Sequence, residues 1–330
     1  MTHPPASAPT AAEPSWYAAG RPPGRVRRCL RAVAVAACLP YLALKFAWIA
    51  GSRIGIPEGS VLLEQRGSMA VLNGVTVAMD GAVIVLALLL TRPSGKRIPA
   101  SLLVLPLWAA TGLLAPIVLA HPLLLLVDTL GGQSGKAAGA GREPFLDAWV
   151  SGVVYTGFVV QGLALGALFA LYARDRWGHL WRGRLGDLPG TAADAARRRT
   201  AAAAILLAPA PLADAYATDR THDVPVLAVV DVVFLAAAVL GACALAFRYP
   251  RRLSVGVPLA LAWTGSGALA CWGAWLSLAP LAADADGIAE RPTDLMYLAY
   301  AGRVIVGVLV AIVGARFLAG RSAALPRRTA

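Results

Sequence analysis

Charged side chains inside apolar segments are the residues of this sequence that could do chemistry. Five of them interrupt long apolar blocks: Lys45, Asp80, Asp214, Asp231 and Arg303. A charge at the middle of a bilayer costs at least about 2.5–3.5 kcal/mol, so such residues pair with one another or face a watery cavity. Cations set among carboxylates in this way could bind an ion or a small polar molecule.

A polar cavity open to the outer side of the membrane is the site that these charges predict. Its lining would be Lys45, Asp80, Asp231 and Arg303, and Asn73, Gln161, Tyr155 and Tyr300 could contribute to it. Above it, at the outer ends of the spans, we expect a vestibule of His121, Asp147, His222 and Asp223. The alternative stays open that the charges form helix-to-helix ion pairs and only fix packing. Lys45 and Asp214 lie shallow enough to reach the surface with their charged ends.

Metal, cofactor and catalytic motifs are not indicated. His121 and His222 with neighbouring aspartates could bind zinc, but no ligand spacing supports a metal site. The segment GGQSGKA at 131–137 resembles part of a phosphate-binding loop, yet Leu130 replaces its first glycine and Ala137 its Ser/Thr. The sequence also lacks HExxH and Gly-x-Ser-x-Gly. We therefore expect no metal, no cofactor and no catalytic residue, which favours a protein that is not an enzyme.

The elements that must position the charges are membrane-spanning helices. Hydrophobic residues make up 58% and charged residues 15% of the 330 residues, with a mean hydropathy of +0.65, whereas soluble domains carry about 25% charged residues. The apolar blocks are about as long as a helix that crosses the hydrocarbon core. They cover residues 30–50, 69–90, 98–120, 145–172, 200–217, 224–247, 253–281 and 295–318. The predicted fold is an all-α bundle of about eight spans.

Basic residues gather in alternate loops, which predicts the orientation. The basic groups lie in 21–31, 92–97, 174–199, 248–252 and 316–328. Because basic loops stay on the cytoplasmic side, both termini are expected in the cytoplasm, with the chain in the plasma membrane. The net charge of +12 then indicates contact with anionic lipids rather than nucleic acid. Residues 1–28 and 320–330 read as cytoplasmic tails, and 174–198 as a basic cytoplasmic loop.

An internal duplication relates the two halves of the chain. With a constant offset, residues 71–115 align on 226–270, and the identities include Arg97/Arg252, Trp108/Trp263 and Gly112/Gly267. With a shorter offset, Tyr155, Gly157 and Gly162 match Tyr300, Gly302 and Gly307. This predicts two four-span repeats, 29–173 and 199–319, parallel to each other about a pseudo-two-fold axis. Coincidence between apolar helices is the alternative.

The duplication also relates two of the carboxylates. Asp231 aligns with Thr76, which lies four residues before Asp80. Positions four apart share one face of a helix. Both halves would therefore present a carboxylate from the same face, one turn apart in depth.

The first span carries a resemblance. Its segment PYLALKFAWIAG, residues 40–51, resembles the first span of uncharacterised multi-pass membrane proteins of high-GC actinobacteria. These combine Pro-Tyr, a basic residue, Trp and Gly at this spacing. The resemblance implies no activity, but it draws attention to Lys45.

The leading interpretation is a plasma-membrane protein that binds or transports a small molecule or ion through a site in the outer half of the bundle. A membrane scaffold or accessory subunit with structural ion pairs is the first alternative. An intramembrane enzyme acting on a lipid is the second.

Overall fold

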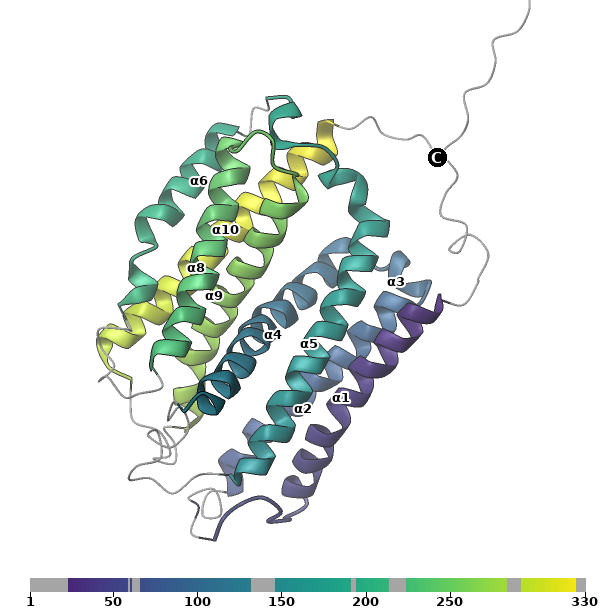
Figure 1. Ribbon diagram of the computed structural model, residues 1–330, viewed down its shortest axis with the longest axis vertical. Coiled ribbons are helices and arrows are strands. Elements are labelled where there is room, and N and C mark those ends of the chain that lie inside the picture. The colour runs from purple at the N-terminus through teal and green to yellow at the C-terminus, as the bar shows by residue number, and fades with distance from the viewer. Residues whose placement is uncertain are drawn as a thin grey trace, which may run out of the picture.

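The described part of the chain is built from helices (Figure 1). The computed structural model describes residues 23–58, 60, 66–131, 146–190, 194–213, 224–283 and 292–324. The α-helices are α1 Arg25–Ile49, α2 Arg66–Thr91, α3 Ser94–Arg97, α4 Ala100–Thr129, α5 Ala148–Trp177, α6 Asp194–Leu207, α8 Val224–Phe247, α9 Gly256–Ala283 and α10 Asp294–Ala324. Short 3₁₀ turns are η2 Gly178–Trp181, η3 Leu185–Asp187 and η4 Ala210–Leu212.

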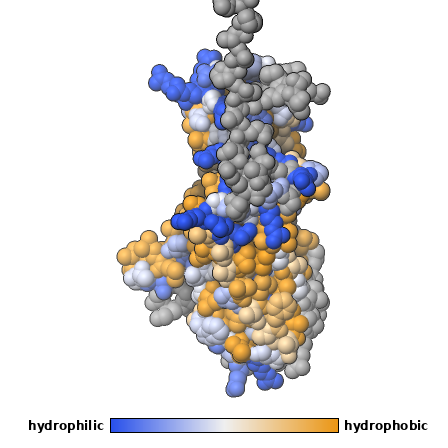
Figure 2. Space-filling model, turned by 90° about the vertical axis from the view of Figure 1, so that its right-hand side faces the viewer, coloured by the Kyte–Doolittle hydropathy of each residue, from blue (hydrophilic) through white to orange (hydrophobic). Residues whose placement is uncertain are grey.

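Six of these helices are long and apolar enough to cross a membrane: α1, α2, α4, α5, α8 and α10. This confirms the all-α class and is compatible with an integral membrane protein. α9 also coincides with a predicted apolar block; it has 28 residues, no charged side chain, and packs against α8, α10 and α4. Figure 2 shows a continuous hydrophobic surface on the face that carries α1, with hydrophilic residues above and below it.

The fifth predicted span is not one continuous helix in the structure. Residues 200–217 were expected to form one helix, but α6 ends at Leu207 and the chain continues through a turn into η4. Pro209 and Pro211 lie at this break, and proline can neither donate a backbone hydrogen bond nor sit unstrained inside a helix. The end of the predicted span, from Asp214 on, is outside the described residues.

The helices form two groups side by side (Figure 1). α1, α2, α4 and α5 surround one apolar core, in which Leu90, Leu103 and Leu168 are fully buried. α6, α8, α9 and α10 surround a second core centred on Leu245 and Val310. We call these the first half and the second half.

The seam between the halves is the contact of α4 with α9. A Cβ on Gly267 would lie 3.0 Å from the Trp108 carbonyl oxygen and 3.1 Å from the Cα of Gly112. The two glycines therefore bring the helix backbones against each other, as small residues do in membrane helix pairs. The Trp108 indole donates to the Ser266 hydroxyl across the seam at 2.9 Å, and Trp263 stacks on Phe169 of α5 with ring centroids 5.0 Å apart.

Arginines fasten the helix ends at one end of the first half. Arg176, in the last turn of α5, donates to the carbonyl oxygens of Gly95 at 3.2 Å and Ile98 at 2.9 Å. Arg27 of α1 pairs with Asp175 at 2.5 Å. The Tyr172 hydroxyl also donates to the Gly95 carbonyl oxygen, at 2.9 Å. The two arginines therefore tie α1, α5 and the α3–α4 junction together. We call this end of the bundle the arginine-rich end.

A second arginine group holds the same end of the second half. Asp194, the first residue of α6, accepts from Arg197 at 2.9 Å and from Arg248, which follows α8, at 2.7 Å. The Arg197 side chain is 2% exposed. Burial lowers the pKa of this guanidinium, and Asp194 acts in the opposite direction. The carboxylate thus compensates two arginines that join α6 to the end of α8.

Candidate functional site

Asp80 is the most deeply buried carboxylate of the predicted site. It lies near the middle of α2, and the residue is 3% exposed. The side-chain amide of Gln161, on α5, donates to its Oδ1 at 3.4 Å. Its Oδ2 has no hydrogen-bond partner among the described residues, and the same is true of Oε1 of Gln161. Two oxygen acceptors are thus buried together without a donor.

Lys45, from α1, is held by neutral groups rather than by a carboxylate. Its Nζ donates to Oδ1 of Asn73 at 2.6 Å. The ammonium also lies 4.8 Å from the ring centroid of Tyr41 and 5.1 Å from that of Trp48, within the range of cation–π attraction. Lys45 is close enough to Asp80 for their charges to attract each other, but no hydrogen bond between them is present.

The helix periodicity explains why these groups share one space. Asn73, Thr76 and Asp80 follow one another at spacings of three and four along α2, and Tyr41 and Lys45 are four apart on α1. Such spacings place side chains on one helix face. The side chains of Tyr41 and Thr76 share a hydrogen bond, so polar contacts run from Lys45 through Asn73 to Thr76, and Asp80 lies one turn further along α2. We call Tyr41, Lys45, Asn73, Thr76, Asp80 and Gln161 the Asp80 cluster.

The predicted outer vestibule is described in part. His121, near the end of α4, stacks on Tyr155 of α5 with ring centroids 5.6 Å apart, and its Nε2 is buried without a partner among the described residues. Asp147 precedes α5, and its backbone amide donates to Gly55 at 2.9 Å. His222 and Asp223, like Asp214, lie outside the described residues.

Asp231 and Arg303 form an ion pair in the second half. The guanidinium of Arg303, on α10, donates to both oxygens of Asp231, on α8, at 3.1 and 2.7 Å. The Arg303 side chain is 8% exposed and that of Asp231 is 42% exposed. Parallel hydrogen bonds of this kind are the strong form of the arginine–carboxylate pair.

The four predicted lining residues therefore fall into two groups. Lys45 and Asp80 belong to the Asp80 cluster in the first half, and Asp231 binds Arg303 in the second. Lys45 and Asp80 contact Asn73 and Gln161 in the first half, and Arg303 contacts Asp231 in the second. In the predicted duplication, Thr76 of the cluster is the residue aligned with Asp231.

Tyr41 and Thr76 are the cluster residues that the sequence analysis did not include in the site. Their spacing is the signal that could have revealed them: each lies four residues from a charged residue of the predicted site, Tyr41 from Lys45 and Thr76 from Asp80.

Metal ligation finds no support in the described ranges, where no three His, Cys, Asp or Glu side chains gather closely enough to hold a metal ion. The chemistry that the Asp80 cluster offers is instead that of oxygen acceptors around one carboxylate. No protein-family model, no curated protein and no solved structure matches this chain.

Proposed function

We propose that the protein is an integral membrane transporter in which the Asp80 cluster binds a small cation, either a proton or an alkali metal ion. The observation that carries this proposal is the buried Asp80 carboxylate, whose Oδ2 lacks a donor beside the equally unpartnered Oε1 of Gln161. A carboxylate in a bilayer interior is stable only when its charge is compensated. A bound cation supplies that compensation.

The chemistry of the cluster favours a cation over an anion or a neutral solute. Carboxylate, amide and hydroxyl oxygens are the ligands of hard cations, and Asp80, Gln161 and Thr76 supply one of each. Lys45 does not satisfy Asp80 directly, because its ammonium is engaged by Asn73 at 2.6 Å. Lys45 therefore limits the net charge of the cluster and leaves the buried carboxylate oxygen to be compensated by a second, exchangeable cation.

Topology is part of the proposal. We place the arginine-rich end and both termini in the cytoplasm of a plasma-membrane protein, with anionic lipids at that face, because basic residues occupy alternate loops. We also propose that the halves are parallel repeats. The contact of Gly112 with Gly267 supports this, since aligned residues meet each other only near a two-fold axis. The family resemblance of residues 40–51 belongs to the same proposal.

Cation flux into liposomes tests the function. Purified protein is reconstituted in liposomes that hold a pH-sensitive dye or a Na⁺-sensitive dye, and a K⁺ diffusion potential set by valinomycin drives entry. Wild type is expected to admit H⁺ or Na⁺ faster than protein-free liposomes, and Asp80→Asn is expected to abolish the difference. The matched control is Asp294→Asn, which alters an exposed carboxylate at the start of α10.

Two results would overturn the proposal. One is wild-type flux no faster than that of protein-free liposomes for either ion. The other is Asp80→Asn moving cations as fast as wild type and Asp294→Asn. Dicyclohexylcarbodiimide, which couples to protonated carboxyl groups in apolar surroundings, gives an independent readout: it is expected to label Asp80, and the transported cation is expected to slow the labelling.

The second candidate function is a membrane scaffold, and the Asp231–Arg303 pair favours it. Its two parallel hydrogen bonds compensate both charges and fix α8 against α10. If this were the role of all the intramembrane charges, Asp80→Asn would lower stability and leave flux at the background value. An enzyme that modifies lipids is the third candidate, and no contact within the described residues favours it.

A further inference from the structure

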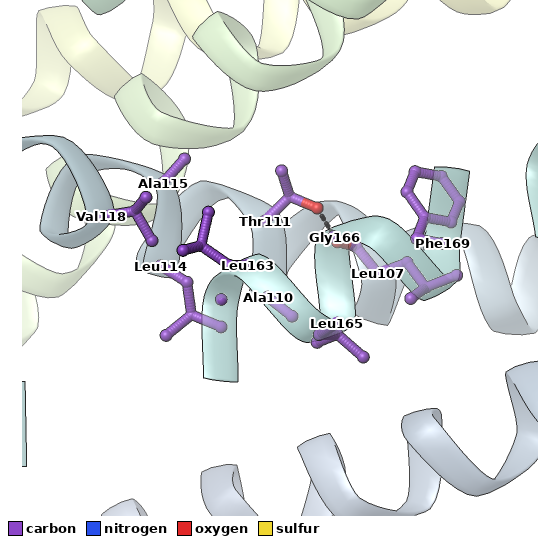
Figure 3. Close-up of a pocket in the computed structure, with 11 residues that line it drawn as sticks. Leu107, Ala110, Thr111, Leu114, Ala115, Val118, Leu163, Leu165, Gly166 and Phe169 are labelled. Atoms are coloured by element: carbon purple, nitrogen blue, oxygen red, sulfur yellow. Dashed lines mark hydrogen bonds between the residues drawn. The ribbon is translucent and has the colours of Figure 1, made fainter. Parts of the chain in front are cut away.

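A second, apolar site lies between α4 and α5, separate from the Asp80 cluster (Figure 3). It is a groove with a volume of about 200 Å³. α4 contributes Leu107, Leu114 and Val118, and α5 contributes Gly162, Gly166 and Phe169. The hydroxyl of Thr111, which also lines the groove, donates to the Leu107 carbonyl of its own helix at 2.7 Å. The lining of the groove is therefore apolar, and the one hydroxyl named in it, that of Thr111, already has a hydrogen-bond acceptor.

The groove is open on one side. A Cβ on Gly166 would meet nothing within 4 Å, and Leu163, on the same stretch of α5, is 59% exposed. Gly162 and Gly166 form a GxxxG pair, which ordinarily brings a second helix into close contact. Here the second glycine of the pair faces open space.

The corresponding helix pair of the second half is closed. Gly307 of α10 aligns with Gly162, and a Cβ on Gly307 would lie 2.7 Å from both the Ala270 nitrogen and the Ser266 oxygen of α9. A Cβ on Gly273 of α9 would meet the Tyr300 oxygen of α10 at 2.7 Å. A Cβ on Gly162 would instead meet side chains of α4, Val118 at 2.8 Å and Leu114 at 3.3 Å. The α9–α10 pair thus packs backbone against backbone, whereas the α4–α5 pair packs through side chains and leaves the open space beside Gly166.

We infer that this groove binds the end of a phospholipid acyl chain. Charge at the nearby helix ends selects this occupant, because the exposed Arg97 and Arg174 would bind the anionic headgroup of a phospholipid whose tail reaches the groove. A hydrocarbon chain is narrow enough, and its apolar surface matches the lining. In a bilayer the groove opens to acyl chains, which are the solvent at that depth.

The depth of the groove indicates from which side the lipid comes. Leu107 lies ten residues after Arg97 along the chain, and most of these residues are in α4, so it is roughly 15 Å from the arginine-rich end. That is about half the thickness of the hydrocarbon core. Arg97, at the end of α3, and Arg174, in the last turn of α5, are exposed at this end. A phospholipid with an anionic headgroup at these arginines would place its tail end in the groove.

Photocrosslinking in nanodiscs tests the inference. The probe is phosphatidylglycerol with a diazirine near the end of one acyl chain, at low content in phosphatidylcholine nanodiscs that hold the full chain. Residues 107–118 and 162–169 are expected to carry the label. Gly166→Leu, whose side chain enters the open space, is expected to lose most of it. Gly152→Leu is the matched control, because Gly152 is an exposed α5 glycine that also has nothing within 4 Å.

Each outcome is decisive. Equal labelling of the wild type, Gly166→Leu and Gly152→Leu would mean general exposure to lipid and would overturn the inference. Crosslinks from the groove to a second copy of the chain would assign the groove to a protein interface and would also overturn the inference.

A second probe carries the diazirine near the ester. It is expected to label the arginine-rich end and not the groove. Equal labelling of the groove by both probes would contradict the assigned depth. None of these results depends on cation flux.

Discussion

Gly112 and Gly267 lie against each other where α4 crosses α9. The sequence alignment that predicts an internal duplication also pairs these two glycines. The seam therefore depends on the absence of a side chain at each position.

Substitution of either glycine is expected to lower the stability of the bundle. A Cβ on Gly112 would overlap the Gly267 carbonyl oxygen, so Gly112→Ala forces the backbones apart, a change of about 1–3 kcal/mol. Gly267→Ala is expected to have a similar effect. Thermal unfolding in detergent measures both. Gly74→Ala is the control, since a Cβ there meets nothing within 4 Å; the seam would lose its assigned role if all three variants melted together with wild type.

The Asp231–Arg303 pair is expected to be structural. Arg303→Met leaves Asp231 without its two hydrogen bonds. Because the Asp231 side chain is 42% exposed, the loss is expected to be smaller than the roughly 3 kcal/mol of a fully buried pair. Asp231→Asn has the same expected sign. The double variant Asp231→Asn/Arg303→Gln is expected to recover most of the loss, because no uncompensated charge remains. Unfolding of the single and double variants in detergent gives the coupling energy, and additive losses would exclude a direct pair.

Lys45 is expected to weaken cation binding at Asp80. Its positive charge repels a second cation, so Lys45→Met should lower the half-saturating cation concentration in the liposome assay by about tenfold, equivalent to roughly 1.4 kcal/mol. Lys45→Arg keeps the charge and is the matched control. An unchanged or raised half-saturation in Lys45→Met would show that the charge of Lys45 does not act at the cation site.

Asp194 is expected to be essential for the second arginine group. Asp194→Asn removes the negative charge shared by Arg197 and Arg248, of which Arg197 is 2% exposed. Leaving a buried arginine uncompensated is expected to destabilise by about 3 kcal/mol, measured as a lower melting temperature in detergent. Asp187→Asn, at an exposed carboxylate in η3, is the control. If Asp194→Asn and Asp187→Asn had the same melting temperature, the contacts of Asp194 with the two arginines would not contribute to stability, and the prediction would be wrong.

Helix positions were predictable from sequence because hydropathy is summed over about 20 residues and single exceptions do not alter it. The blocks at 30–50 and 295–318 coincide closely with α1 and α10. The fifth block was not resolved by hydropathy, because the average over about 20 residues is still apolar when it includes Pro209 and Pro211. Their effect is on backbone hydrogen bonding, which hydropathy does not measure.

The charged residues of the site were also found from sequence, but their partners were not. A charge in an apolar block is visible without any structure, which is how Asp80 and Arg303 were identified. Which residue each one meets depends on helix rotation and crossing. Lys45 is an example: sequence places it among carboxylates, and the fold turns its ammonium to the amide of Asn73. The α4–α5 groove has no sequence signal, since Gly162, which packs against side chains, is the same residue type as Gly307, which packs against backbone.

The two halves are packed unequally: α9 and α10 are in tight contact, whereas α5 has open space beside it. Gly273 and Gly307 bring the backbones of α9 and α10 so close that neither helix has space to rotate against the other, so the second half is expected to keep its shape. α5 is held less tightly beside its groove, and it carries Gln161, which reaches Asp80 at 3.4 Å. Rearrangement on cation release would therefore concentrate on α5, with the seam at α4 as its boundary.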